Sequence, residues 1–598
     1  RVYAPVGSHE DLLAYLVRRL LENGANTSFV NRIVDEKLPI EEIVGDPVAR
    51  VRRLSDKPHP RIPLPKDLYG TERQNSAGID LTDIDRLEPL ARAMQRDSAE
   101  PWHAAPLIGG AASSGKAREM SDPADRRRRI GEVVEADAAA VDQALSRAVR
   151  AQHDWNGGGA SARADCLNRA ADLMEQDGAT LMAMAIREAG KTLPDALAEL
   201  REAVDFLRYY AARARADFAQ PLALPGPTGE RNQLQLAGRG VFACISPWNF
   251  PLAIFSGQVG AALAAGNAVI AKPAEQTPLI AARAVAILHR AGVPGDVLHL
   301  LPGDGPGVGA PLVADPRIAG VAFTGSTETA QGINRALAAR SGPLAALIAE
   351  TGGQNVMLVD SSALPEQVVR DVLISSFQSA GQRCSALRIL CVQEDIADKL
   401  IDMLAGAMAE LRVGDPGLLS TDIGPVIDGE AKAMLDAHGA RMTREGKLIY
   451  EIALGPDCAE GCFVSPRAFE IDRLDRLQRE VFGPILHVLR FRQDRLDQIL
   501  GSIDALGYGL TLGIHSRIDA TVRHIHERLR IGNTYVNRNM IGAVVGVQPF
   551  GGERLSGTGP KAGGPHYLPR FATERTLSVD TTAAGGNASL LSLNEEGT

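Results

Sequence analysis

The apolar positions of this chain change their spacing along its length, and these changes divide it into regions. Between residues 136 and 218 they recur at helical spacing, in sequence rich in Ala and Leu. From Val241 onward, short apolar runs alternate with helical patterns, which is typical of βαβ units around a parallel sheet. The strand candidates are apolar throughout, as strands covered on both faces are, and span Val241 to Ile245, Ala268 to Ala271, Val297 to Leu301 and Ile318 to Phe323. A second α/β region is predicted from about residue 350 to about residue 535.

The regions before and between these units have other patterns. Residues 1–7 predict a short strand, and leucines at i, i+4 spacing predict a helix that ends at Gly24. Prolines interrupt residues 55–122, so most of this stretch is predicted to be a connector with one helix, and a domain boundary is expected in it. Leu234 and Leu236 alternate with polar residues, and so does the segment Thr576 to Asp580. Exposed strands of this kind suit an oligomer interface.

Composition and charge exclude several classes of protein. The 598 residues are 45% hydrophobic and 23% charged, which indicates an ordinary multidomain globular protein. The net charge of −9 opposes nonspecific binding to nucleic acid or to an anionic membrane, and the run Arg126 to Arg129 is interpreted as a solvated edge. The most apolar stretch, Val259 to Ala271, falls short of the ~20 residues that span a bilayer. A small-molecule partner is therefore favoured.

Six scattered cysteines indicate a reducing, cytoplasmic setting. Cys458 and Cys462 are spaced like metal ligands, but no second Cys or His pair follows, so a surface loop is favoured and no structural metal is expected. The chain begins at Arg1 without a charged start followed by an apolar core. No signal peptide is therefore expected, and the native N-terminus is expected to lie upstream.

Cys384 is a candidate nucleophile at a helix-to-strand corner, in the sequence Gly381-Gln-Arg-Cys-Ser385. A cysteine is more often a small buried hydrophobe, and Cys244 and Cys391, inside apolar strands, fit that alternative. The glycine and polar neighbours of Cys384 predict exposure instead. Arg383 is expected to favour the thiolate, which is the form that attacks a carbonyl carbon.

Two polar residues after apolar segments are candidates to assist such a nucleophile. Glu350 precedes Thr351-Gly-Gly-Gln-Asn355, where a carboxylate can act as a general base; the alternative is a helix-end charge in water. Asn249, in Ser246-Pro-Trp-Asn-Phe250, can donate its amide to a developing oxyanion; the alternative is a turn residue after proline.

A phosphate site is suggested by Phe323-Thr-Gly-Ser-Thr327, which follows a strand and opens a helix, where backbone N–H groups are free. Neither this run nor the glycines between Gly303 and Gly309 has the G-x-G-x-x-G spacing. The dinucleotide fingerprint is therefore absent, and a simple turn is the alternative interpretation of both runs.

Taken together, these residues resemble the aldehyde dehydrogenase superfamily from about Trp102 to the C-terminus. The resemblance implies an α/β fold with a Rossmann-like NAD-binding domain (101–349, with a flap hairpin at about 219–240), an α/β catalytic domain (350–535) and a closing segment (536–598) with an oligomerisation strand. It implies that Cys384 is the nucleophile and Glu350 the base for deacylation. Asn249 and the Cys384 backbone N–H would form the oxyanion hole.

The resemblance also implies an NAD site. Lys272 and Glu275, in Lys-Pro-Ala-Glu, would hold the adenosine ribose, and Glu480 and Phe482 the nicotinamide ribose. A carboxylate at Glu275 would repel a 2′-phosphate, so NAD is preferred over NADP. The other cofactor residues implied are Ile245, Ser246, Pro247, Trp248, Phe323, Thr324, Gly325, Ser326, Thr351 and Gly352.

Two segments, Ile541 to Gly552 and Leu555 to Gly564, resemble the Δ1-pyrroline-5-carboxylate dehydrogenase branch, which converts L-glutamate γ-semialdehyde to L-glutamate in the second step of proline catabolism. Arg554 stands where that branch is expected to have a small residue. The resemblance implies a substrate site with the α-carboxylate on Ser385 and on the backbone of Gly542 and Ala543, Phe250 and Phe550 beside the aliphatic part, and Arg383 nearby.

The first residues resemble the end of a proline dehydrogenase barrel, as in bifunctional proline utilization A proteins. Residues 1–37 would be the barrel remnant and 38–100 a linker. By this resemblance Tyr3, Arg18 and Arg19 belong to a proline site, whereas by composition they form a solvated helix face. FAD and proline dehydrogenase activity would require the flavin-binding remainder of the barrel upstream.

Two rival functions stay open. One is a general aldehyde dehydrogenase with another substrate, and the other is a binding or structural protein that keeps the fold without turnover. The presence of Cys384, Glu350 and Asn249 argues against the second. A coenzyme A-acylating relative is disfavoured, because that chemistry does not need the hydrolytic glutamate.

Overall fold

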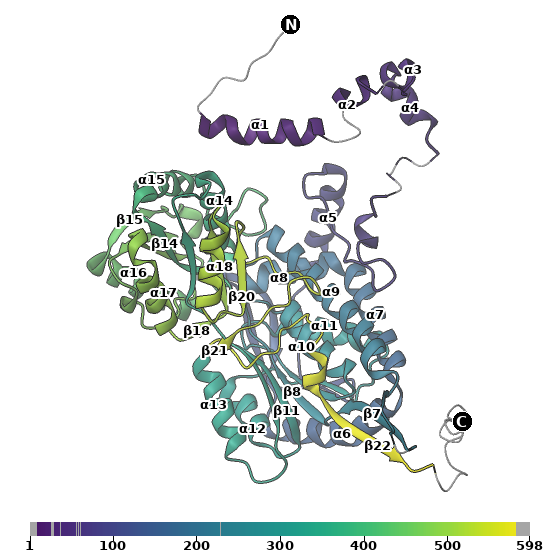
Figure 1. The fold of residues 1–598 in the computed structure, drawn as a ribbon. Coiled ribbons are helices and arrows are strands. Elements are labelled where there is room, and N and C mark those ends of the chain that lie inside the picture. The colour runs from purple at the N-terminus through teal and green to yellow at the C-terminus, as the bar shows by residue number, and fades with distance from the viewer. Residues whose placement is uncertain are drawn as a thin grey trace. The chain divides into compact units, whose positions relative to one another are not determined.

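The computed structural model describes residues 9–24, 29–35, 37–55, 57, 59, 61–227 and 229–581 and divides into two compact units, Arg1–Leu68 and Tyr69–Thr598. The helix predicted to end at Gly24 is confirmed, whereas the strand predicted over residues 1–7 lies outside the described residues. The described helical segments of the first unit are α1 (His9–Gly24), α2 (Phe29–Ile33), α3 (Ile40–Val44), α4 (Pro47–Arg53) and the turn η1 (Pro65–Asp67) (Figure 1).

The proline-rich stretch 55–122 holds more structure than the sequence predicts. The one predicted helix is α5 (Ile84–Asp97), but four strands also lie here, namely β1 (Trp102–Ala104), β2 (Leu107–Ile108), β3 (Ala111–Ala112) and β4 (Ala117–Asp122). The connector interpretation is therefore wrong for the end of this stretch. These strands are too short to show the alternation of apolar and polar residues that predicts a strand. In addition, β2 pairs with a strand far along the chain, since Leu107 lies opposite Leu300.

The first large sheet has the strand order β12-β11-β8-β9-β10-β2-β3. Five of its strands run parallel to one another: β8 (Val241–Ile245), β9 (Ala268–Lys272), β10 (Leu298–Leu300), β11 (Ile318–Thr324) and β12 (Ala346–Glu350). The four predicted strands are thus confirmed. Strands are added first on one side of β8 and then on the other, so the order reverses between β8 and β11. Ligands bind beyond the carboxyl ends of the strands at such a reversal, as in Rossmann-like folds.

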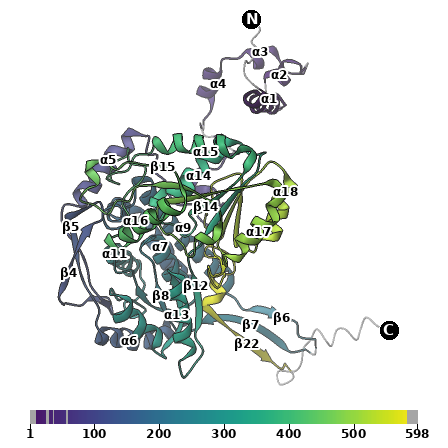
Figure 2. The ribbon, with the colours of Figure 1, turned by 90° about the vertical axis from the view of Figure 1, so that its left-hand side faces the viewer.

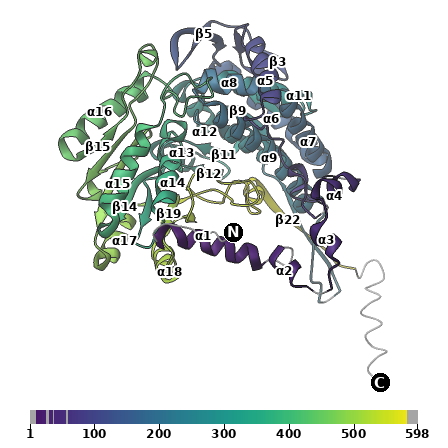
Figure 3. The same ribbon diagram turned by 90° about the horizontal axis from the view of Figure 1, so that it is seen from above.

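Helices cover both faces of this sheet, and residues 136–218 are helical as predicted (Figures 1 and 3). Each residue of β9 is buried, which explains its wholly apolar sequence up to Lys272. The helices of this half are α6 (Ala138–Gly157), α7 (Ala160–Gln176), α8 (Gly178–Ala189), α9 (Leu193–Phe218), α10 (Ala253–Ala264), α11 (Pro278–Arg290), the turn η2 (Gly305–Gly309), α12 (Ala310–Ala314) and α13 (Thr327–Ala338).

The second large sheet has the order β15-β16-β17-β14-β13-β19-β20 and its own apolar core, so the second predicted α/β region is confirmed. Its strands are β13 (Asn355–Val359), β14 (Leu387–Gln393), β15 (Lys447–Glu451), β16 (Arg467–Ile471), β17 (Ile485–Phe491), β19 (Thr511–His515) and β20 (Asn533–Val536). Its helical segments are α14 (Pro365–Phe377), η3 (Gln378–Gly381), α15 (Glu394–Ala409), α16 (Gly429–Glu445), η4 (Pro456–Cys458), η5 (Leu474–Arg476), η6 (Gln493–Arg495), α17 (Leu496–Ala505) and α18 (Asp519–Arg528).

The predicted exposed strands form a separate three-stranded antiparallel sheet of β6 (Leu222–Leu224), β7 (Arg231–Gly238) and β22 (Ala572–Val579). Figure 2 shows it extending away from the rest of its unit. Leu222 is 62% and Leu577 is 55% exposed on it.

The chain between β20 and β22 runs between the two halves, where it is yellow in Figures 1 and 3. It contains β21 (Glu553–Arg554), which pairs with β18 (Tyr508–Gly509), and the turn η7 (Leu568–Phe571). Thr351 N donates to Ser556 O over 3.0 Å, which ties this segment to the end of the first sheet.

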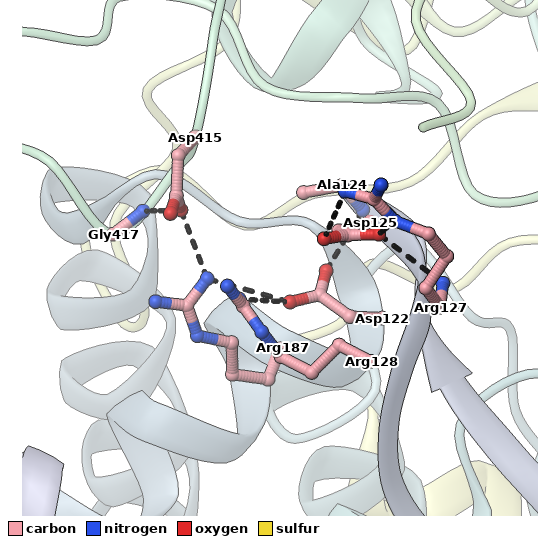
Figure 4. A network of polar contacts seen from close by, with 8 residues as sticks. All are labelled: Asp122, Ala124, Asp125, Arg127, Arg128, Arg187, Asp415 and Gly417. Carbon is pink, nitrogen blue, oxygen red and sulfur yellow. Dashed lines mark hydrogen bonds and ion pairs between the residues drawn. The ribbon is translucent and has the colours of Figure 1, made fainter. Parts of the chain in front are cut away.

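A polar network joins the two halves at another place (Figure 4). Asp122 is fully buried, and its Oδ2 pairs with Arg128 at 2.8 Å and with Arg187 at 3.4 Å. Arg187 also pairs with Asp415 of the second half at 2.9 Å. Arg126 to Arg129 lie within β5 (Asp125–Val134) and are all exposed, which confirms the interpretation of this run as a solvated edge. One of these arginines neutralises a buried carboxylate.

Cys458 lies in a small apolar cluster beside this network and Cys462 in the apolar core of the second half, so the prediction of a surface loop is wrong. They are 5% and 2% exposed, and Cys458 packs with Ala124 and Phe463. In the described part of the chain, no group of three His, Cys, Asp or Glu residues is placed to hold a metal ion. A membrane-spanning helix is likewise absent from the described helices, because none is both long and apolar enough.

Candidate active site

Cys384 lies at the predicted corner, between the end of η3 and the start of β14. The chain turns sharply there because Ser379, Ala380 and Gly381 have φ values of 57°, 52° and 67°. A side chain at Gly381 would place its Cβ 2.3 Å from the Gly483 carbonyl oxygen, so only glycine fits. Asn355 Nδ2 donates to the Cys384 carbonyl over 2.6 Å and holds the corner to β13.

The thiol of Cys384 is partly enclosed, and burial raises its pKa to about 12, helped by the negative charges of Glu480 and Glu350. The prediction that Arg383 favours the thiolate is not supported. Arg383 is itself buried, and its guanidinium pairs with Asp195 at 2.8 Å and lies 5.3 Å from the centre of the Phe250 ring. The raised pKa therefore favours the neutral thiol over the thiolate at neutral pH.

Glu350 is the last residue of β12, so the alternative of a helix-end charge in water is excluded. Gly552 N donates to its Oε2 over 3.2 Å, and its Oε1 is buried without a hydrogen-bond partner among the described residues. Burial raises the pKa of this carboxyl to about 8, against the opposing charge of Lys561. A carboxylate with that pKa can exchange a proton near neutral pH.

Asn249 follows β8 and is buried against the Cys384 corner, since its Nδ2 donates to Gln382 O over 3.1 Å. Its own carbonyl accepts from Lys191 Nζ. Lys191 pairs with Glu199 at 3.2 Å, both almost fully buried, and Glu199 Oε1 accepts from Leu252 N over 2.8 Å. A buried ion pair thus fixes the turn that carries the Asn249 amide.

Two cavities meet at Cys384, and Thr324 and Thr351 line both of them. The first spans about 820 Å³, including space open to solvent, and its walls are mostly apolar. Its walls include the predicted substrate residues Phe250, Arg383, Ser385, Ala543 and Phe550 together with Glu350. Gly542 does not line this cavity, although Ile541 and Ala543 on either side of it do.

The second cavity encloses about 1020 Å³ and opens beyond the strand reversal of the first sheet. Trp248 and Phe482 meet edge to face in it, with ring centres 5.5 Å apart. It is lined by predicted cofactor residues from four segments of the chain, which are Pro247, Trp248, Gly325, Ser326, Gly352, Glu480 and Phe482.

The remaining predicted cofactor residues lie on neighbouring strands. Ile245 pairs with Lys272 and with Phe323 across β8, and Ser246 N donates to Lys272 O over 3.1 Å. Lys272 Nζ is 3.6 Å from Glu275, so these two stand together as predicted.

Of the residues assigned to a proline site, Arg18 and Arg19 lie on α1, where Arg19 pairs with Glu22 at 2.7 Å. Tyr3 lies outside the described residues.

The second cavity is shaped for close contact with a ligand. A Cβ at Gly352 would lie 1.6 Å from Glu480 Oε2, so the absence of a side chain there lets the carboxylate reach the cavity wall. Ser326 Oγ accepts from Thr329 N over 3.1 Å and caps α13, whose first N–H groups face the cavity end. A ribose hydroxyl and a pyrophosphate fit this combination of carboxylate and helix start.

Several residues around the site were missed from the sequence. Glu202 lines the first cavity, where burial and the charge of Glu199 raise its pKa to about 7, opposed by Arg383 and Lys191. Arg73 is buried, pairs with Asp205 at 3.1 Å and donates to Val545 O over 2.7 Å. It therefore holds the segment that contains Gly542 and Ala543.

The unexpected Arg554 has a structural explanation. Its φ is 63°, in the region that favours glycine, and its guanidinium donates to Asp504 Oδ1 over 2.7 Å and to Asp504 O over 2.8 Å. These two bonds offset the strain of the backbone.

Known proteins resemble this chain along almost its whole length. Residues 111–577 match a family described as aldehyde dehydrogenase family, and residues 1–32 match one described as proline dehydrogenase. The bifunctional protein PutA of Klebsiella aerogenes is 54% identical, over 96% of this chain and 44% of its own length. A solved structure of Bradyrhizobium japonicum proline utilization A superposes with a TM-score of 0.87 and 53% identity, over 98% of this chain and 56% of that one.

A single-function relative also matches. The structure of a Thermus 1-pyrroline-5-carboxylate dehydrogenase with bound NAD has a TM-score of 0.80 and 31% identity, over 85% of this chain and 98% of that one. The chain thus spans about half the length of the bifunctional relatives and nearly all of the single-function one.

Proposed function

The chain belongs to the aldehyde dehydrogenase family, and on that premise we propose that it oxidises L-glutamate γ-semialdehyde to L-glutamate with NAD. The observation that carries the proposal is the meeting of two cavities at one thiol, with Glu350 in the wall of the first. The similarity to a 1-pyrroline-5-carboxylate dehydrogenase along nearly all of that protein supports the substrate.

In the first step, the Cys384 thiol releases its proton to solvent water, and its sulfur adds to the aldehyde carbon while the carbonyl π electrons move to oxygen. The carbonyl oxygen then carries a negative charge, which we expect the Asn249 Nδ2 and the Cys384 backbone N–H to stabilise. Donors fixed in advance need no reorganisation at this point, and the Lys191–Glu199 pair provides that rigidity for Asn249. Glu480 and Phe482 would hold NAD in the second cavity, and the bound nicotinamide would supply the acceptor for the hydride of the substrate carbon.

In the second step, the acyl group is a thioester on Cys384. Glu350 removes a proton from a water molecule, which attacks the thioester carbonyl, and the sulfur leaves and regains a proton. Glu350 suits this role because its Oε1 has no other partner among the described residues and its pKa is close to neutral. Hydrolysis releases the carboxylic acid and restores the thiol.

The lining of the first cavity includes polar and apolar groups of the kinds that an amino acid semialdehyde could contact. Ser385 and the backbone near Ala543 can receive an α-carboxylate, while Phe250 and Phe550 offer apolar contact to the methylene carbons. Glu202 adds a carboxylate that can accept from an α-ammonium group. An unsubstituted aliphatic aldehyde would leave these groups unpaired, at about 1–3 kcal/mol per group.

The substrate is tested by comparing kcat/KM for glutamate semialdehyde and pentanal in the wild type and in S385A. We expect a strong preference for glutamate semialdehyde that falls by about tenfold or more in S385A, with little change for pentanal. Equal specificity constants in the wild type would support the general aldehyde dehydrogenase instead.

Further parts of the proposal concern the longer protein. We propose that a proline dehydrogenase domain with FAD precedes this chain, because residues 1–32 match that family and the bifunctional relatives are about twice as long. The sheet of β6, β7 and β22 is proposed to join copies of the chain. All six cysteines are free thiols, which agrees with a cytoplasmic enzyme that depends on one of them.

A further inference from the structure

Arg388 is the bulkiest of the fully buried side chains in the described part of the chain. It is the second residue of β14 and follows Cys384 by four positions. A guanidinium keeps its proton in a protein, so burying one is costly unless acceptors surround it. The hydrogen-bond acceptors of the Arg388 guanidinium come from two separate parts of the site.

The first set of acceptors belongs to the Cys384 corner. Arg388 Nη1 donates to Gly381 O over 2.6 Å, and Nη2 donates to Arg383 O over 3.0 Å. These carbonyls lie on the N-terminal side of Cys384, and Arg383 is its immediate neighbour. The guanidinium therefore fixes the backbone from which the nucleophile projects.

The second set belongs to the segment 480–483, which lines the cofactor cavity. Arg388 Nη1 also donates to Gly483 O over 3.2 Å, Nη2 lies 3.4 Å from Glu480 Oε1, and the guanidinium is 5.2 Å from the centre of the Phe482 ring. Gly381 and Gly483 also touch directly, since a Cβ on Gly381 would lie 2.3 Å from Gly483 O. The two segments thus meet on one side chain.

We propose that Arg388 is a positioning residue that holds the nucleophile corner and the ribose-binding segment in one fixed relation. Resting on the proposed function, this assigns one side chain to set the distance between Cys384 and the nicotinamide ring. The planar fork of a guanidinium can reach all four acceptors at once, whereas a lysine ammonium cannot. The positive charge also compensates the buried Glu480 carboxylate and keeps it available as an acceptor.

The test compares R388K and R388M with R163K. Arg163 is a matched control, because it is 3% exposed and donates to Ala264 O over 3.0 Å and Asn156 O over 2.9 Å, but lines neither cavity. Two measurements need no aldehyde: the Kd for NAD by calorimetry, and the rate of Cys384 alkylation by iodoacetamide, with C384A as the blank. Thermal unfolding is recorded for all variants.

We expect R388K to weaken NAD binding and to slow alkylation, each by about tenfold, while R163K changes neither by more than about twofold. The double variant R388K/E480Q should lose less NAD-binding free energy than the sum of the losses in R388K and E480Q, because both substitutions act on one segment. R388K with wild-type Kd and alkylation rate, or effects that simply add, would overturn the proposal. R388K carries the decision if R388M does not fold.

These readouts separate the two proposals. A wild type that binds NAD and oxidises pentanal as well as glutamate semialdehyde refutes the proposed substrate, and the Arg388 measurements still stand. A wild type that binds no NAD refutes the proposed function and with it the role of Arg388.

Discussion

Replacing Glu350 with Gln tests the assigned base through both kinetics and stability. With a pKa of about 8, roughly a tenth of Glu350 is ionised at pH 7 and about nine tenths at pH 9. Where hydrolysis limits turnover, the steady-state rate of the wild type should therefore rise about tenfold between pH 7 and pH 9. In E350Q that rise should vanish, and an initial burst of NADH should leave an acyl group on Cys384 that mass spectrometry detects.

The same substitution should stabilise the fold at neutral and alkaline pH. The folded pKa of about 8 lies above the ordinary value of 4.5, so the unfolded chain releases this proton first. The free energy of unfolding therefore falls as the pH rises from about 4.5 to about 8, by no more than about 1.4 kcal/mol per pH unit. The fall is smaller where water reaches the carboxylate. E350Q should therefore exceed the wild type in Tm at pH 8 and match it at pH 4.

Glu188 offers a control, because burial raises its pKa to about 8 as well. Its two oxygens accept from Leu279 N over 2.6 Å and Ile280 N over 2.9 Å and so cap α11. E188Q should leave one of these N–H groups poorly satisfied and keep the kinetic pH profile of the wild type. A wild-type rate and profile in E350Q, with no trapped acyl group, would refute the role of Glu350.

Three further predictions address other parts of the structure. C384A should abolish aldehyde oxidation and keep the Kd for NAD within about threefold, measured by calorimetry, since the thiol is lost and the ribose contacts are not; substantial residual turnover would exclude Cys384 as the nucleophile. R73M should raise KM more than it lowers kcat, because the segment around Val545 loses its buried donor, and a change in kcat alone would contradict this. R187M should lower the free energy of unfolding by about 1–3 kcal/mol, because it leaves the buried Asp122 with one partner fewer. R147M, which breaks an exposed ion pair, should lower it by less than about 1 kcal/mol. Urea unfolding measures both losses, and equal losses would contradict the prediction.

The strands and the corner that carry the chemistry were predictable because their signals are local. β8 and β11 are largely apolar runs followed by polar residues or glycine, and residues just after them line the second cavity. Cys384 was predictable from a local signal too, because it follows the end of a helical pattern. The family resemblance then supplied the roles, which no spacing within the chain could assign.

What escaped prediction depends on partners far away in the sequence. Arg73 and Val545 are 472 positions apart, and Lys191 and Asn249 are 58 apart, so no local pattern connects them. Arg383 was misjudged for the same reason. Its neighbour along the chain is Cys384, but its charge is taken up by Asp195, 188 positions away.

The electrostatics of the site also explain why its two steps follow one another. Burial raises the pKa values of both Cys384 and Glu350, and the charges of Glu480 and Glu350 raise that of Cys384 further, so neither group ionises readily at neutral pH. When the sulfur attacks, its negative charge moves to the carbonyl oxygen, where Asn249 and a backbone N–H can receive it, and then leaves with the hydride. Only after the thioester has become neutral can Glu350 ionise without a second negative charge nearby. A substitution that placed a permanent anion beside Cys384 should therefore slow both steps.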